Sequence, residues 1–107
     1  MDEEELIDIG SGVRIRWSWR GDEKVGLIEY HECSAGGSCP KASEGFLAGF
    51  CGGAVLFDRP QVRENWPGRE LWTVEQEDPL TLSPSLACAC PGCGHHGWIR
   101  EGRWVPA

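Results

Sequence analysis

Residues 88–96 place three cysteines and two histidines within nine positions. This segment therefore offers more soft ligands than one metal ion takes from one loop. A structural zinc ion is held by four protein ligands, usually two from each of two turns that lie far apart in the sequence. We therefore expect a small fold that is closed by a metal ion, with this segment as one of the two turns.

The first pair of ligands is expected at Cys33 and Cys39, in a glycine-rich segment whose backbone can bend around an ion. Cys90 and Cys93 have the two-residue spacing that lets a tight turn direct both sulfurs at one ion. Cys93 and His96 have the same spacing, with a sulfur and an imidazole. Spacing alone does not decide whether the second pair is Cys90 with Cys93 or Cys93 with His96. The predicted zinc ligands are therefore Cys33, Cys39, Cys90, Cys93 and His96.

Three further candidates are interpreted without a metal. Cys51 lies farther along the chain and reads as a small buried hydrophobic residue. His31 reads as a strand histidine on a hydrated face. His95 would point away from an ion held by His96, and we expect it to support the site from behind or to face solvent.

The sequence also bears on the redox state of the six cysteines. No stretch approaches 18 apolar residues, and the N-terminal segment is acidic where a signal peptide would be basic and then apolar. We expect a cytoplasmic protein that does not enter membranes, in which a reducing environment disfavours disulfides. Three disulfides are the alternative, and the Cys88-Ala-Cys90 spacing fits them poorly.

The clearest secondary-structure signal is the alternation of apolar and polar residues over residues 13–20, which is typical of a half-buried strand. A turn at Gly21-Asp22 and a second strand over residues 24–32 predict an antiparallel hairpin. Residues 70–76 alternate again, and Glu101-Gly102 is expected at the turn of a C-terminal hairpin.

One short helix is expected over residues 59–66, capped by Asp58. The predicted fold is therefore mainly β: a small, zinc-stapled antiparallel β domain with zinc-ribbon-like turns and at most one short helix. Residues 11–107 are expected to form this single domain, and residues 1–10 an acidic, mobile tail.

The formal net charge of −7 makes nucleic acid an unlikely partner, because a grip on phosphates needs clustered Lys and Arg. Acidic surfaces favour solubility and cationic partners.

The C-terminal thirty residues resemble a small family of unknown function found in actinobacterial phages. The resemblance is carried by Ser83-Pro84-Ser85, then Cys93 and His96 with two residues between them, then Trp98-Ile99-Arg100. In that family an upstream cysteine pair with the terminal cysteine and histidine resembles a zinc site. The resemblance implies Cys33, Cys39, Cys93 and His96 as ligands here, with Cys90 as a substitute, and implies no activity.

The sequence contains no His-Glu-x-x-His helix, no nucleophile elbow and no phosphate-binding loop. We therefore expect a structural zinc and a protein-interaction module for a host or viral partner, without turnover. A zinc-dependent hydrolase and a virion component are the alternatives. Six tryptophans suit partner binding. Trp17 and Trp19 share one strand face and are expected in the core, whereas Trp66 is the candidate surface anchor.

Overall fold

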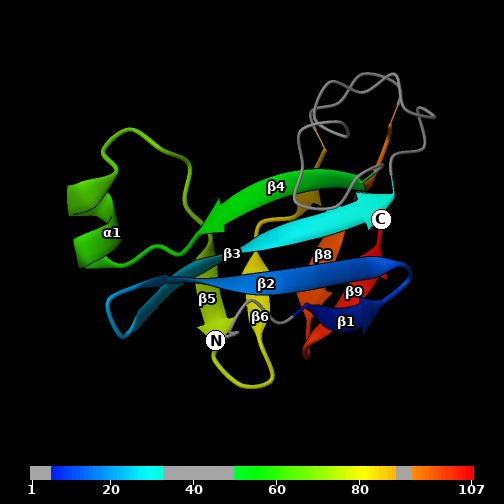
Figure 1. The fold of residues 1–107 in the computed structure, drawn as a ribbon, viewed down its shortest axis with the longest axis horizontal. Coiled ribbons are helices and arrows are strands. Elements are labelled where there is room, and N and C mark those ends of the chain that lie inside the picture. Colours follow the sequence, from blue (N-terminus) through cyan, green and yellow to red (C-terminus); the bar gives the residue numbers. More distant parts are fainter. Residues whose placement is uncertain (1–5, 33–49, 89–92) are drawn as a thin grey trace.

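The chain folds mainly into antiparallel strands in the computed structural model, which describes residues 6–32, 50–88 and 93–107 (Figure 1). The fold class predicted from the sequence, mainly β with one short helix among the described residues, is confirmed. In chain order the elements are β1 (Ile7–Gly10), β2 (Val13–Arg20), β3 (Glu23–Glu32), β4 (Phe50–Leu56), α1 (Pro60–Asn65), β5 (Thr73–Gln76), β6 (Thr81–Ser83), β7 (Leu86–Ala87), β8 (His96–Arg100) and β9 (Arg103–Pro106).

The first layer is a four-stranded antiparallel sheet in the order β1-β2-β3-β4. The alternation in β2 explains its orientation: Val13 and Ile15 are buried, whereas Arg14 between them is exposed. Successive residues of a strand point to opposite faces of a sheet, so one face of β2 packs on the core and the other meets water. The hairpin predicted for residues 13–32 is confirmed as the β2–β3 pair.

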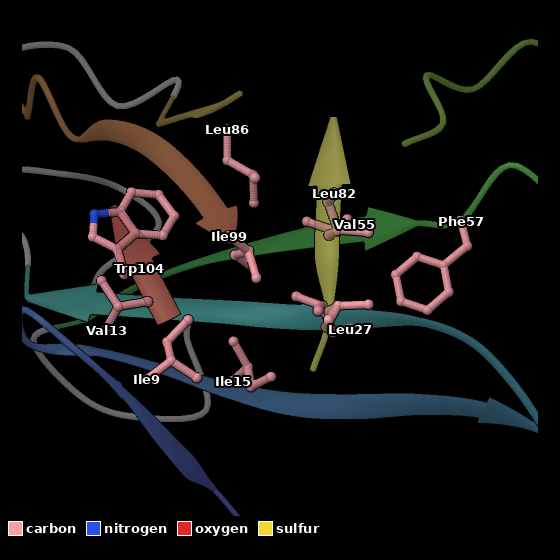
Figure 2. Close-up of a cluster of buried hydrophobic side chains, with 11 residues drawn as sticks. Ile9, Val13, Ile15, Leu27, Val55, Phe57, Leu82, Leu86, Ile99 and Trp104 are labelled. Carbon is pink, nitrogen blue, oxygen red and sulfur yellow. The ribbon is translucent and has the colours of Figure 1, made fainter. Parts of the chain in front are cut away.

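The second layer consists of the β5–β6 pair and a three-stranded sheet in the order β7-β8-β9. Figure 1 shows the four-stranded sheet lying across these strands. Side chains from both layers meet in one hydrophobic core, in which the first layer's aliphatic side chains face those of β6, β7, β8 and β9 (Figure 2). The buried members of this core are Ile9, Val13, Ile15, Leu27, Val55, Phe57, Leu80, Leu82, Leu86, Ile99 and Trp104.

The C-terminal hairpin turns where the sequence predicts. Glu101 and Gly102 both have positive φ, at 52° and 73°, which is the conformation of the two central residues of a tight hairpin turn. Gly97 on β8 has no room for a side chain, because a Cβ there would lie 2.5 Å from the carbonyl oxygen of Val105 and 2.7 Å from the ring of Trp104. Glycine at position 97 therefore lets β8 pack closely against β9 and the Trp104 ring of the core.

Two local predictions are wrong. Asp58 does not cap α1: the capping position is Arg59, without a side-chain hydrogen bond, and Asp58 instead pairs with Arg63 in the last turn. Trp17 and Trp19 do not share one environment either. Trp17 is half-buried against the core, whereas Trp19 is 57% exposed, because the β2–β3 register shifts between Ser18 and Trp19.

The structure also extends the ordered sheet toward the N-terminus. The sequence groups residues 7–10 with the acidic tail, but the structure pairs them with β2 as strand β1. Ile9 is 3% exposed and belongs to the core, which outweighs the acidic character of Asp8 next to it. The ordered β structure therefore begins before residue 11, and residues 1–5 lie outside the described part of the chain.

Candidate metal centre and serine–histidine pair

The pairing of β3 with β4 brings two potential ligands together. His31 and Cys51 are direct partners in the antiparallel register, and they are 4% and 1% exposed. Two further cysteines arrive from the second layer: Cys88 directly follows β7, and Cys93 lies just before β8. The backbone N–H of Cys88 donates to the carbonyl of His95 at 2.9 Å, which continues the β7–β8 pairing and holds this connection in place.

The four side chains form a compact group. The imidazole and thiol ligand atoms of His31, Cys51, Cys88 and Cys93 all lie within 4.8 Å of one another. His31 Nε2 lies 3.3 Å from Cys93 Sγ. Around a tetrahedral ion with bonds of about 2.0–2.3 Å, neighbouring ligand atoms are separated by roughly 3.5–3.8 Å. The group therefore has the ligand types, number and spacing to hold one metal ion.

Glu29 orients the histidine of this group. Its Oε2 lies 2.8 Å from His31 Nδ1, and both side chains are buried. A histidine that binds metal through one ring nitrogen commonly donates from the other nitrogen to a carboxylate, which sets its tautomer and orientation. Glu29 therefore leaves Nε2 of His31 directed at the cysteine sulfurs.

The charges of this pair follow from the same contacts. Burial disfavours the charge of Glu29, but its hydrogen bond with His31 and its close contacts and charge interactions with His31 and His95 hold its pKa below its usual value. Burial also opposes a charge on His31, yet Glu29 and Cys93 hold the pKa of His31 above its usual value. Both directions follow from the pairing of the Glu29 carboxylate with the His31 imidazole.

His95 packs behind His31. The two rings stack with centroids 3.6 Å apart at an interplanar angle of 14°, and His95 stacks in turn on Trp104 at 4.5 Å and 11°. His95 Nε2 lies 3.1 Å from Glu29 Oε2, without hydrogen-bond geometry. His95 therefore links the candidate metal centre to the hydrophobic core, and its side chain is partly buried.

The sequence-predicted ligands are distributed unevenly. Cys93 lies in the group, whereas Cys33, Cys39 and Cys90 lie outside the described residues. His96 lies away from the cysteines and is directed at Ser85.

Two of the three residues that the sequence analysis interpreted without a metal, His31 and Cys51, lie in the group. The assignment of His31 to a hydrated face is wrong, because the residue is buried. Cys51 is buried as expected, yet it is also placed among potential ligands. Only the β3–β4 register reveals these two.

A second arrangement lies on the outer side of the β7–β8 pair. His96 Nε2 is 2.8 Å from Ser85 Oγ. Ser85 directly precedes β7, and His96 begins β8 opposite Ala87. Because successive strand residues alternate in direction, His95 points inward toward Glu29 while His96 points outward toward the serine.

Neighbouring groups hold both members of this pair. Trp72 Nε1 donates to the carbonyl oxygen of Ser85 at 3.3 Å, and the ring of His96 lies 5.7 Å from that of Trp98. A serine hydroxyl within hydrogen-bond reach of an imidazole is the arrangement of a nucleophile and its general base. The sequence analysis missed this pair because the two residues lie eleven positions apart, and only strand pairing joins them. In the sequence, the Ser83-Pro84-Ser85 segment and the Cys93-x-x-His96 segment are the one signal that could have indicated the Ser85–His96 pair.

The predicted partner-binding residue is not fully exposed. Trp66 is partly buried and packs, with Leu71, against the small cluster of Val25, Leu56 and Val62. Arg20 lies over its ring at 5.9 Å. Among the described residues, the large hydrophobic side chain that is exposed is Trp19.

None of the helices in the described ranges is long and apolar enough to cross a membrane.

Comparison with known proteins gives one family. The model of the bacterial ubiquitination-like system serine protease (BubE) matches residues 51–107. No curated protein matches the chain, and no solved structure matches it. None of these comparisons shows the phage family that the C-terminal segment resembles. The matched residues include Cys51, Cys88 and Cys93 as well as Ser85 and His96, and they make up more than half of the chain. The chain therefore belongs to the family of the bacterial ubiquitination-like system serine protease BubE.

Proposed function

We propose that this protein is a serine protease that acts on a protein of a bacterial ubiquitination-like system, with Ser85 as nucleophile and His96 as general base. The observation that carries the proposal is the 2.8 Å contact between Ser85 Oγ and His96 Nε2. The description of the matched family, a serine protease of a bacterial ubiquitination-like system, supports the same reaction.

The reaction follows from this geometry. Ser85 Oγ attacks the carbonyl carbon of the scissile peptide bond while His96 Nε2 takes the hydroxyl proton. The tetrahedral intermediate collapses, the C–N bond breaks, and His96 gives its proton to the leaving amine. Water, deprotonated by His96, then attacks the resulting acyl ester and releases the carboxylic acid and free Ser85. The strand pairing of β7 with β8 keeps the two side chains in register throughout.

We further propose that the metal is zinc and that its role is structural. Three thiolates and one imidazole are a soft ligand set that suits zinc. Four protein ligands fill a tetrahedron, and no position is left open for a substrate or water. When bound, zinc would contribute folding free energy, on the order of 10 kcal/mol in small finger peptides. All steps of the peptide-bond cleavage are then assigned to Ser85 and His96.

The metal would also position the reacting pair. Cys88 follows Ser85 by three residues, and Cys93 precedes His96 by three. An ion that holds both cysteines to β3 and β4 would anchor both arms of the β7–β8 pair. The proposed location is the cytoplasm, where thiols stay reduced and can bind metal.

A protein-interaction role is the second candidate, and the exposure of Trp19 favours it. Lys24 lies over the rings of both Trp17 and Trp19, with Nζ at 3.8 and 5.5 Å from their centroids. Such an aromatic and cationic surface would serve to bind a protein partner, with or without catalysis.

Covalent labelling with an alkyl fluorophosphonate tests the proposed activity. The purified protein should acquire one adduct on Ser85, and Ser85→Ala and His96→Ala should lose it. Ser83→Ala, which changes the neighbouring serine of the same motif, is the matched control and should be labelled like the unchanged protein. An unlabelled protein that still captures a partner through Trp19 would favour the interaction role instead.

A further inference from the structure

A hollow of about 330 Å³ lies between the two layers, beside the candidate metal centre, whose residues His31, Cys51 and Cys88 line its inner part. One wall is β4, over residues 52–55, and the opposite wall is β7, at Leu86 and Ala87. Trp72, which holds the carbonyl of Ser85, also lines the hollow. The space therefore reaches the backbone beside Ser85, the residue that we propose as the nucleophile.

The outer edge of β4 faces this hollow. Phe57 N–H donates to Val25 on β3 at 2.9 Å, whereas the carbonyl of Leu56 accepts from Trp72 on the other side at 2.8 Å. Backbone groups of a strand alternate in direction with a period of two residues. The N–H and C=O groups of Gly52 and Ala54 therefore point away from β3, along the edge to which no described strand is paired.

The edge of β7 faces the same space. Cys88 N–H donates to His95 beside β8 at 2.9 Å, so by the same alternation the N–H and C=O of Ala87 point away from β8. The carbonyl of Ser85, two residues earlier, points to that side as well and accepts from Trp72. Two strand edges thus present hydrogen-bonding groups to one hollow.

Gly53 keeps the hollow open. It lies on the same face of β4 as Cys51 and Val55, which is the interior face. A Cβ at Gly53 would meet only Glu29 Oε1, at 3.9 Å, so the packing of the described residues does not require glycine there. Glycine weakens a strand, and its presence in one often marks the close approach of a ligand or another backbone.

Arg69 gives the hollow a charge preference. It lines the space and is exposed, and none of the acidic side chains in the described ranges forms an ion pair with it. The carboxylate that also lines the hollow, Glu29, is already engaged with His31. An acidic side chain of a bound molecule would therefore find an available cation at Arg69.

We propose that this hollow binds the scissile segment of the protein substrate as an extended strand inserted between β4 and β7, with an acidic side chain directed at Arg69. The inserted segment would hydrogen-bond to Gly52, Ala54 and Ala87, which is recognition by strand addition. This proposal rests on the proposed protease function and names the way in which its substrate is held.

Binding is tested without chemistry. The zinc-loaded Ser85→Ala protein, labelled with ¹⁵N, is titrated with the acetylated, amidated peptide Ala-Ala-Asp-Ala-Ala. The amides of Gly52, Ala54 and Ala87 should shift and exchange more slowly with solvent. Gly53→Val in this background should weaken binding about tenfold or more, whereas Thr73→Val, at an exposed position of β5 that does not line the hollow, should bind as before. Shifts that avoid these amides, or equal binding by the Gly53→Val protein, would overturn the proposal.

A charge exchange provides the second arm. Arg69→Glu should lose the aspartate peptide and gain the matching peptide with lysine in place of aspartate. Fluorophosphonate labelling of the Gly53→Val protein, which keeps Ser85, separates the proposed protease function from the proposed strand insertion. The probe is small and does not need the hollow, so its labelling reports on Ser85 alone. Labelling without peptide shifts would overturn strand insertion and leave the protease, whereas shifts without labelling would overturn the protease and leave the binding site.

Discussion

His95 and His96 are neighbours in sequence, and they belong to two regions with opposite physical character. His95 points inward, stacked between His31 and Trp104 beside the buried cysteines, whereas His96 is exposed and reaches Ser85. In the first region the charged groups are buried, so removing one partner leaves another charge unpaired and costs free energy of folding. In the second region the polar pair is exposed, so water can replace a lost partner. The comparison teaches that two adjacent residues can face a buried candidate metal group on one side and an exposed serine–histidine contact on the other.

The largest effect is expected when a member of the buried region is removed. Cys51→Ser and Cys93→Ser should each lose zinc and lower the melting temperature by roughly 10 °C or more, because a metal ion with three ligands no longer clamps β4 to the β7–β8 connection. Differential scanning calorimetry and elemental analysis measure both quantities. Ala87→Ser, an exposed change beside Cys88, is the control and should alter neither. A melting temperature unchanged in Cys51→Ser would return this residue to the role of simple core filler.

The next effect concerns the exposed region, where we expect activity to be lost while zinc content and stability are kept. Ser85→Ala should reduce cleavage of a protein substrate by about a thousandfold or more while leaving zinc content and melting temperature unchanged. Activity assays and melts on the same preparations provide the measurement. A variant that both loses activity and unfolds would show that the two regions are not separable in the way we describe.

Glu29→Gln should produce an intermediate effect, because it keeps the size of the side chain and removes its charge. We expect a 10- to 100-fold loss of zinc affinity, as for other carboxylates that hold a ligating histidine. Competition with a chromogenic chelator measures the affinity. Glu32→Gln, at the exposed end of the same strand, is the matched control. An unchanged affinity in Glu29→Gln would mean that His31 does not depend on Glu29 for its orientation.

The smallest effects extend the comparison of buried and exposed groups to the tryptophans. Trp66→Ala should destabilise the protein by about 2 kcal/mol, because this ring packs beside Val62. Trp19→Ala should change the free energy of unfolding by less than about 1 kcal/mol. Urea titrations of both variants give the numbers. Capture of a partner by the unchanged protein that is lost only in Trp19→Ala would place an interaction surface at the β2–β3 hairpin rather than at Trp66.

The sequence predicted those parts of the fold that depend on local pattern. The alternation over residues 13–20 predicted β2, and Glu101-Gly102 predicted the C-terminal turn. It did not predict the exposure of Trp19, because the register shift in the β2–β3 pair is not encoded in the period of β2 itself. Local patterns predict elements, and irregularities in pairing follow from both strands together.

The candidate sites depended on long-range pairing and were predicted only in part. Close spacing drew attention to Cys93, but His31 and Cys51 become neighbours only through the β3–β4 register. Ser85 and His96 likewise meet only because β7 pairs with β8. The sequence spacing within each of these two pairs matches no known motif, so a single sequence could not identify either pair.

The zinc content and the reactivity of His96→Ala test the central claim most directly. The sequence predicts His96 as a metal ligand, whereas its contact with Ser85 supports the proposed role as general base. We expect purified His96→Ala to retain one zinc ion per chain and to lose labelling of Ser85 by the fluorophosphonate. Loss of the zinc ion in this variant, or undiminished labelling of Ser85, would contradict the account.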